Sequence, residues 1–171
     1  MTRRSWITAT LLAWVAMIGI DLLLHAGLLA PLYDWDSPFL LSPQEAFVRI
    51  PAGYLAFGVL AGGLVWLVAR LGISSAREAA GIGATGGAVV WGALLLGLWS
   101  ISSAGAPLLA AWWVGQTAEL AVGGYVGGLA LAGARVRSVA FAAVAILLTG
   151  AVVAVVLQSI GYAPAPIIVN S

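Results

Sequence analysis

The 171-residue chain has no cysteine and no lysine, and only 8% of its residues are charged. The lack of cysteine excludes disulfides, thiolate metal sites and iron–sulfur clusters. The lack of lysine excludes Schiff-base chemistry and a Walker-type phosphate loop, because both need a lysine amine. The net charge is only +1, so we expect no basic surface and no nucleic-acid partner.

Hydrophobic residues make up 63% of the chain instead, and the mean hydropathy is +1.09. Soluble domains carry about 25% charged residues, so this composition is typical of a membrane protein. Five apolar segments approach the ~20 residues that a helix needs to span a bilayer. They are residues 6–30, 46–71, 79–102, 108–132 and 139–160. We therefore predict an all-α, polytopic bundle of five transmembrane helices that forms a single domain over residues 1–171.

The first of these segments follows Arg3 and Arg4 and resembles a secretory signal peptide in that respect. It is about 25 residues long, however, whereas the apolar part of a signal peptide has 7–15. We therefore expect a retained helix.

The positions of the arginines predict the orientation. With five spans, only Arg49 falls on one side, and the other arginines fall at the N-terminus and in the second and fourth loops. The positive-inside rule then places the N-terminus in the cytoplasm and the C-terminus outside. We expect a multi-pass protein of the inner (plasma) membrane, in contact with membrane lipid.

Many of the 22 glycines recur at four-residue spacing. The pairs are Gly58 and Gly62, Gly83 and Gly87, Gly123 and Gly127, and Gly124 and Gly128. Such spacing places small residues on one helix face, where a neighbouring backbone can approach closely in lipid. We therefore expect the second, third and fourth spans to form the tight centre, and the fifth to face lipid at the periphery. The same faces favour a homo-oligomer.

Glu119, near the middle of the fourth apolar segment, is the strongest pointer to function. A carboxylate at that depth costs about 2.5–3.5 kcal/mol on insertion scales, so it needs a partner, a proton or a water-filled cavity. At about 1.5 Å per residue, Glu119 lies roughly 16 Å and Asp21 roughly 13 Å below the predicted outer boundary. Other polar or aromatic residues in the same outer half are His25, Arg49, Tyr54, Trp112 and Gln116.

Two spacings group these side chains. Asp21 and His25 are four residues apart, and Gln116 and Glu119 are three apart, so each pair shares a helix face. We expect the two faces to meet in a polar pocket that opens outward and binds a small hydrophobic molecule. Because burial favours a neutral carboxylic acid, we expect that binding to be linked to a proton. The expected roof consists of Trp112, Trp113 and residues 33–36.

Other interpretations of the same residues stay open. Polar side chains also join transmembrane helices without further function, with measured pairs averaging about 0.6 kcal/mol. A proton-coupled transporter is a second interpretation, although we find no inverted repeat and expect no proline to interrupt a span. A structural subunit of a membrane complex is a third. An enzyme is not expected, because no acid–base pair accompanies a nucleophile.

Metal and cofactor sites have little support from the sequence. One histidine and two carboxylates can bind zinc or iron, but no His-Glu-x-x-His or Glu-x-x-His motif is present. We therefore predict no metal site, identify no cofactor, and note that haem ligation would depend on His25 alone. Arg49 is expected to anchor at the membrane interface, or to pair with Asp21 or an anionic ligand.

Two resemblances concern the fold. Asp21 followed by Tyr33, the sequence Pro51-Ala52-Gly53-Tyr54 and the glycine-rich third and fourth spans resemble a group of small bacterial inner-membrane proteins. That resemblance covers residues 1–130 and implies a fold but no activity. The five spans, the eight tryptophans and Tyr33-Asp34-Trp35 are similar to the tryptophan-rich sensory (translocator) proteins, which would imply tetrapyrrole or sterol binding. The Trp-Tyr and Pro-x-Trp signatures of that family are missing here.

Overall fold

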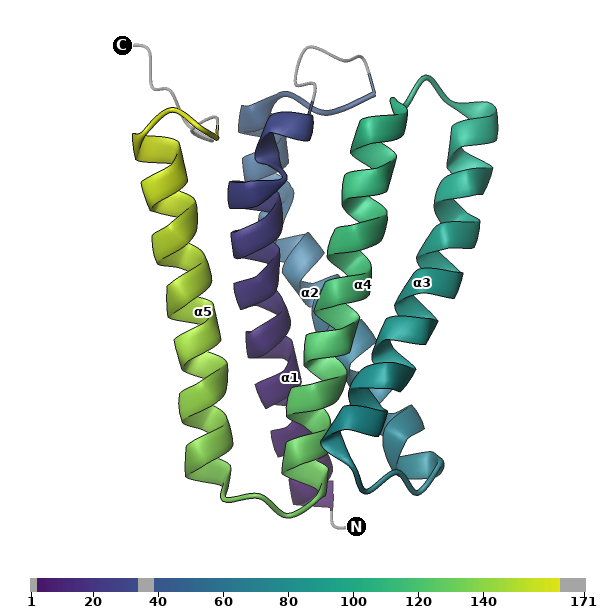
Figure 1. Cartoon of the computed structure of the whole chain (residues 1–171), viewed down its shortest axis with the longest axis vertical. Coiled ribbons are helices and arrows are strands. Elements are labelled where there is room, and N and C mark those ends of the chain that lie inside the picture. The colour runs from purple at the N-terminus through teal and green to yellow at the C-terminus, as the bar shows by residue number, and fades with distance from the viewer. Residues whose placement is uncertain (1–2, 34–38, 164–171) are drawn as a thin grey trace.

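The computed structural model describes residues 3–33 and 39–163, and these residues form an all-helical bundle without strands (Figure 1). Its long helices are α1 (Arg3–Leu23), α2 (Pro43–Arg70), α3 (Ala76–Ile101), α4 (Ala106–Leu131) and α5 (Val136–Ser159). The last four predicted spans coincide with α2–α5 to within about one turn, and the first, 6–30, covers most of α1 and the π-helical turn Leu24–Leu28, so the all-α prediction is confirmed. Pro51 lies inside α2, but the helix continues from Pro43 to Arg70, so this proline does not interrupt the span.

Four of the helices, α1, α2, α3 and α5, are long and apolar enough to cross a membrane. This is compatible with a multi-pass membrane protein. The remaining helix, α4, is as long as α3, but Gln116, Thr117 and Glu119 make its middle more polar. Large apolar side chains on the outer faces are exposed, as lipid-facing side chains are in a bundle. Examples are Val59 of α2, Val90 of α3 and Val152 of α5.

The centre of the bundle consists of α1 and α4, with α3 and α5 at its two edges and α2 behind (Figure 1). The prediction of a centre made by the second, third and fourth spans is therefore wrong, since α2 and α3 scarcely touch. The fifth helix lies at an edge as expected, but it packs closely on α1. A Cβ atom built at Gly150 would lie 2.0 Å from the carbonyl oxygen of Gly19.

The glycine pairs singled out in the sequence pack inside the chain. On the contact between α3 and α4, a Cβ at Gly83 would lie 2.0 Å from the Leu120 carbonyl oxygen, so the two backbones touch directly. On α2, Gly58 faces the indole of Trp14 from α1 instead. Gly62 faces Thr10 and Trp6 of α1 in the same way, so this glycine pair meets side chains of α1 rather than the backbone of α3.

The end of α1 departs from regular helix. After Leu23 the chain forms a π-helical turn (Leu24–Leu28) and then a 3₁₀ turn (Ala30–Leu32). Such a transition leaves backbone carbonyls without helical partners, and Gln158 Nε2 of α5 donates a hydrogen bond to the Ala26 carbonyl at 3.0 Å. Single π-helical turns inside helices are frequent at functional sites, and this one carries the only histidine of the chain.

Candidate functional site

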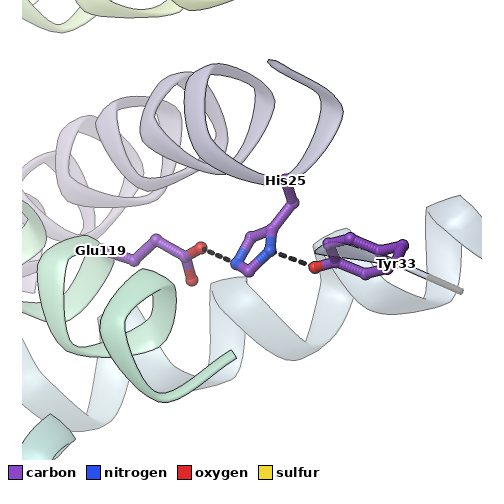
Figure 2. A network of polar contacts seen from close by, with 3 residues as sticks. All are labelled: His25, Tyr33 and Glu119. Carbon is purple, nitrogen blue, oxygen red and sulfur yellow. Dashed lines mark hydrogen bonds and ion pairs between the residues drawn. The ribbon is translucent and has the colours of Figure 1, made fainter. Parts of the chain in front are cut away.

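Three titratable side chains from two helices converge in the bundle. Asp21 comes from α1, His25 from the π-helical turn and Glu119 from α4. Each offers one nitrogen or oxygen atom, and these atoms all lie within 4.8 Å of one another. The His25 Nε2 atom lies 3.2 Å from Glu119 Oε1. Figure 2 shows the imidazole between the Glu119 carboxylate and the Tyr33 hydroxyl, which contacts Nδ1.

Glu119 is completely buried, with 0% of its side chain exposed, and no other charged side chain is buried in the described part of the chain. Its Oε1 lies within ion-pair distance of His25 Nε2, but the contact lacks the angles of a hydrogen bond. Neither carboxylate oxygen has a hydrogen-bond partner among the described residues, and neither does His25 Nε2. An unpaired carboxylate in such surroundings costs several kcal/mol, so a proton or a cation is needed beside it.

Gly115, one turn before Glu119 on α4, makes room for the imidazole. A Cβ atom at this position would lie 2.2 Å from His25 Nε2 and 2.5 Å from Cε1, so a larger residue would displace the ring. Neither Gly115 nor the π-helical turn was identified from the sequence. The importance of this glycine depends on the histidine that packs against it from the opposite helix, and no residue pattern marks the π-helical turn.

Tyr33 holds the other side of the imidazole. The two rings meet edge to face, with centroids 6.0 Å apart and an interplanar angle of 88°. Burial raises the pKa of the Tyr33 hydroxyl above its usual value, and a hydrogen bond with Trp112 partly offsets this. The hydroxyl therefore stays protonated at neutral pH and fixes the orientation of the His25 ring. The rest of the predicted roof, residues 34–36, lies outside the described residues.

A cavity of about 530 Å³ lies beside Asp21 and His25, between α1, α2 and α5. Its wall is mainly apolar. The polar side chains in it are those of Asp21, His25, Tyr33, Tyr54 and Gln158. Among the described residues the backbones of α2 and α5 do not approach each other, and the cavity lies between them. Glu119 is not part of the wall and contacts the His25 side chain from α4.

The structure brings together only part of the predicted set. Tyr54 shares the cavity with Asp21, but Gln116 does not line it, and the Gln116 Oε1 atom has no hydrogen-bond partner among the described residues. Arg49 is exposed on α2 and does not line the cavity. Trp113 does not cover the cavity, because its indole N–H donates to a carbonyl of α3 at 2.9 Å.

A second cavity of about 320 Å³ lies between α3 and α4. Its lining consists of Gly92, Leu95, Leu96, Trp99, Ala106, Leu109, Ala110 and Trp113. None of these side chains titrates, so this cavity offers packing surface but no group that could orient or activate a ligand. The candidate site is therefore the first cavity together with the carboxylate–imidazole cluster at its wall.

The chain matches no protein-family model, no curated protein and no solved structure. The two resemblances stated above therefore stay predictions, and the geometry of the cavity and the cluster supports the functional conclusions.

Proposed function

We propose that the protein binds a small lipid-like molecule in the cavity between α1, α2 and α5. A volume of about 530 Å³ suits such a ligand, because small-molecule sites usually measure about 300–1,000 Å³ and are mostly apolar with a few polar groups. The apolar side chains of Phe47 and Ile50 on α2 and Val155 on α5 line the cavity and are exposed. The gap between these helices would face acyl chains in a bilayer, so the ligand enters sideways from the lipid.

The wall of the cavity favours a particular kind of polar end group. Gln158 and Tyr33 lie at one end of the cavity. Asp21 and Tyr54 are the polar lining residues farthest from that end. No arginine lines the cavity in the described part of the chain, so an anionic group would meet the Asp21 carboxylate without a compensating charge. A neutral hydrogen-bond donor or an amine is therefore preferred.

A filled-cavity variant tests this function. Gly53 lines the cavity and a Cβ atom there would meet nothing within 4 Å, so Gly53→Phe fills the space without a backbone clash. Gly63→Phe is the matched control, because Gly63 lies on the same helix with equally open surroundings but outside the cavity. We expect Gly53→Phe to weaken binding of a dansyl-labelled long-chain amine by about tenfold or more, equivalent to about 1.4 kcal/mol. Equal affinity of both variants would refute the proposed site.

The membrane topology is part of the proposal. We propose that α4 crosses the bilayer together with the other four helices, because they shield its polar middle from lipid. The arginine distribution then places the N-terminus in the cytoplasm and the cavity in the outer half of the inner membrane. Since the chain has no cysteine, single-cysteine variants Ser74→Cys and Ser103→Cys in two successive loops give a clean test. An impermeant maleimide should label only Ser103→Cys on spheroplasts.

Proton-coupled transport is a second candidate, because Glu119, His25 and Tyr33 form a continuous set of groups that can exchange a proton. Against it, Met17 and Val65 are fully buried apolar residues of the central core and offer no group that can exchange a proton. Proton flux in proteoliposomes that is lost in Glu119→Gln would favour transport over simple binding. A structural-subunit role would instead predict that the protein co-purifies with other chains and that Gly53→Phe has no effect on its function.

A further inference from the structure

We propose that Asp21, His25 and Glu119 bind one divalent transition-metal ion of the zinc type. This site goes beyond the proposed binding of a lipid-like molecule and does not depend on it. The three ligand atoms come from α1, the adjoining π-helical turn and α4, so they converge only in the folded bundle.

The spacing of the ligand atoms fits such an ion. Zinc binds histidine nitrogen and carboxylate oxygen at about 2.0–2.2 Å, so two ligands of a tetrahedral site lie about 3.3–3.5 Å apart. His25 Nε2 and Glu119 Oε1 are 3.2 Å apart, close to this value. The third ligand atom, from Asp21, lies within 4.8 Å of the other two, so the Asp21 side chain would move closer to complete the set.

The polar groups of the cluster lack the partners that an ion would supply. The fully buried Glu119 carboxylate and His25 Nε2 have no hydrogen-bond partner in the part of the chain that the structure describes. On the other side of the ring, Nδ1 contacts the Tyr33 hydroxyl. Histidines that bind metals through one nitrogen usually hold the other against such a polar partner, which fixes the ring and its tautomer. With the imidazole proton on Nδ1, donated to the Tyr33 oxygen, Nε2 would have its lone pair available for an ion.

Charge and ligand type favour a metal ion over a proton. Two carboxylates and one divalent ion form a neutral group, which a low-dielectric bundle tolerates far better than two carboxylates without a counter-ion. A single proton can be shared by only two of the three ligand atoms, whereas a metal ion can bind all three. The imidazole ligand favours zinc, copper, iron or nickel over magnesium and calcium, which prefer oxygen. Asp21 and His25 also line the cavity, so the proposed ion would lie next to it.

The test is metal binding by the purified full-length chain in detergent, after treatment with a chelator and without the labelled amine. We expect one equivalent of Zn²⁺ by calorimetry and mass spectrometry, and no displacement by excess Mg²⁺. Co²⁺ should give visible absorption bands of a site with nitrogen and oxygen ligands. The chain has one histidine, so a ¹⁵N-histidine label gives one imidazole signal set, in which Zn²⁺ should shift Nε2.

Glu119→Gln should weaken Zn²⁺ binding by more than about 100-fold. Loss of a group that only supports a metal ligand weakens binding by about 10–100-fold, so a larger effect identifies Glu119 as a ligand. The matched control is Glu78→Gln, since Glu78 lies in the first turn of α3, outside the cluster, and should bind Zn²⁺ as the unaltered chain does. If Glu119→Gln does not fold, His25→Gln removes another ligand with the same expected result.

Absence of stoichiometric Zn²⁺ binding, or equal affinity in Glu119→Gln and the unaltered chain, would overturn the metal site. So would an imidazole spectrum that Zn²⁺ leaves unchanged. The result is separable from the lipid-like ligand, because Gly53→Phe fills the cavity but does not alter any of the three metal ligands. An unaltered chain that binds the amine but not Zn²⁺ overturns the metal site alone, and one that binds Zn²⁺ but not the amine overturns the ligand cavity alone.

Discussion

The Gly115→Ala substitution tests the packing that holds the cluster together. The new Cβ atom would lie 2.2 Å from His25 Nε2, whereas non-bonded heavy atoms prefer separations of about 3.5–4.0 Å. The imidazole must therefore move by more than 1 Å, roughly the difference between these values. The ring contacts Glu119 through one nitrogen and Tyr33 through the other. A ring that moves this far cannot keep both contacts, so we expect the 3.2 Å contact with Glu119 to be lost.

The expected loss of stability is about 1–3 kcal/mol, the usual cost of inserting one extra carbon into a packed core. Gly97→Ala is the control, because a Cβ at Gly97 on α3 meets nothing within 4 Å and should change stability by about 0.5 kcal/mol or less. Reversible unfolding in mixed micelles, followed by circular dichroism, measures both. The imidazole signals of the ¹⁵N-labelled protein should shift in Gly115→Ala and stay unchanged in Gly97→Ala.

A double-mutant cycle separates a clash with the ring from any other effect of the methyl group. In a His25→Ala background the imidazole is absent, so Gly115→Ala should cost almost nothing. If the substitution is as destabilising in that background as in the original chain, the clash with His25 does not explain its effect. If Gly115→Ala is neutral and leaves the imidazole spectrum unchanged, the packing described here is incorrect.

Three further substitutions test other parts of the fold and site. Gly83→Ala should destabilise by about 1–3 kcal/mol or more, since its Cβ would meet the backbone of α4, whereas Gly86→Ala in open surroundings should be neutral in the same unfolding assay. Gln158→Leu leaves the Ala26 carbonyl without its side-chain donor and should cost about 0.5–1.5 kcal/mol, with faster amide exchange in the π-helical turn. Tyr33→Phe should weaken Zn²⁺ binding by about 10–100-fold and broaden the imidazole signals, whereas unchanged affinity would argue against a positioning role.

The helices could be predicted from sequence because their length and composition are local properties. Apolar runs near the length of a bilayer crossing give helix positions directly, since backbone groups in lipid must be paired within the segment. Glycine spacing predicted close packing, but it did not identify the partners. Gly83 and Gly150 both meet a neighbouring backbone, whereas Gly58 meets an indole, and the spacing is the same for Gly58 and Gly83. The side chains opposite a glycine decide which of these occurs.

For the site, the sequence by itself determined which groups are chemically costly in a membrane. A lone glutamate in an apolar segment, and an aspartate and a histidine one turn apart, can be recognised from residue type and helical period. Only the tertiary structure decided that α1 and α4 are neighbours, that the π-helical turn aims His25 at Glu119, and that Gly115 gives the ring its space. The reason is physical: the cost of burying a charge depends on the residue, but the atoms that compensate for it come from helices far apart in the chain.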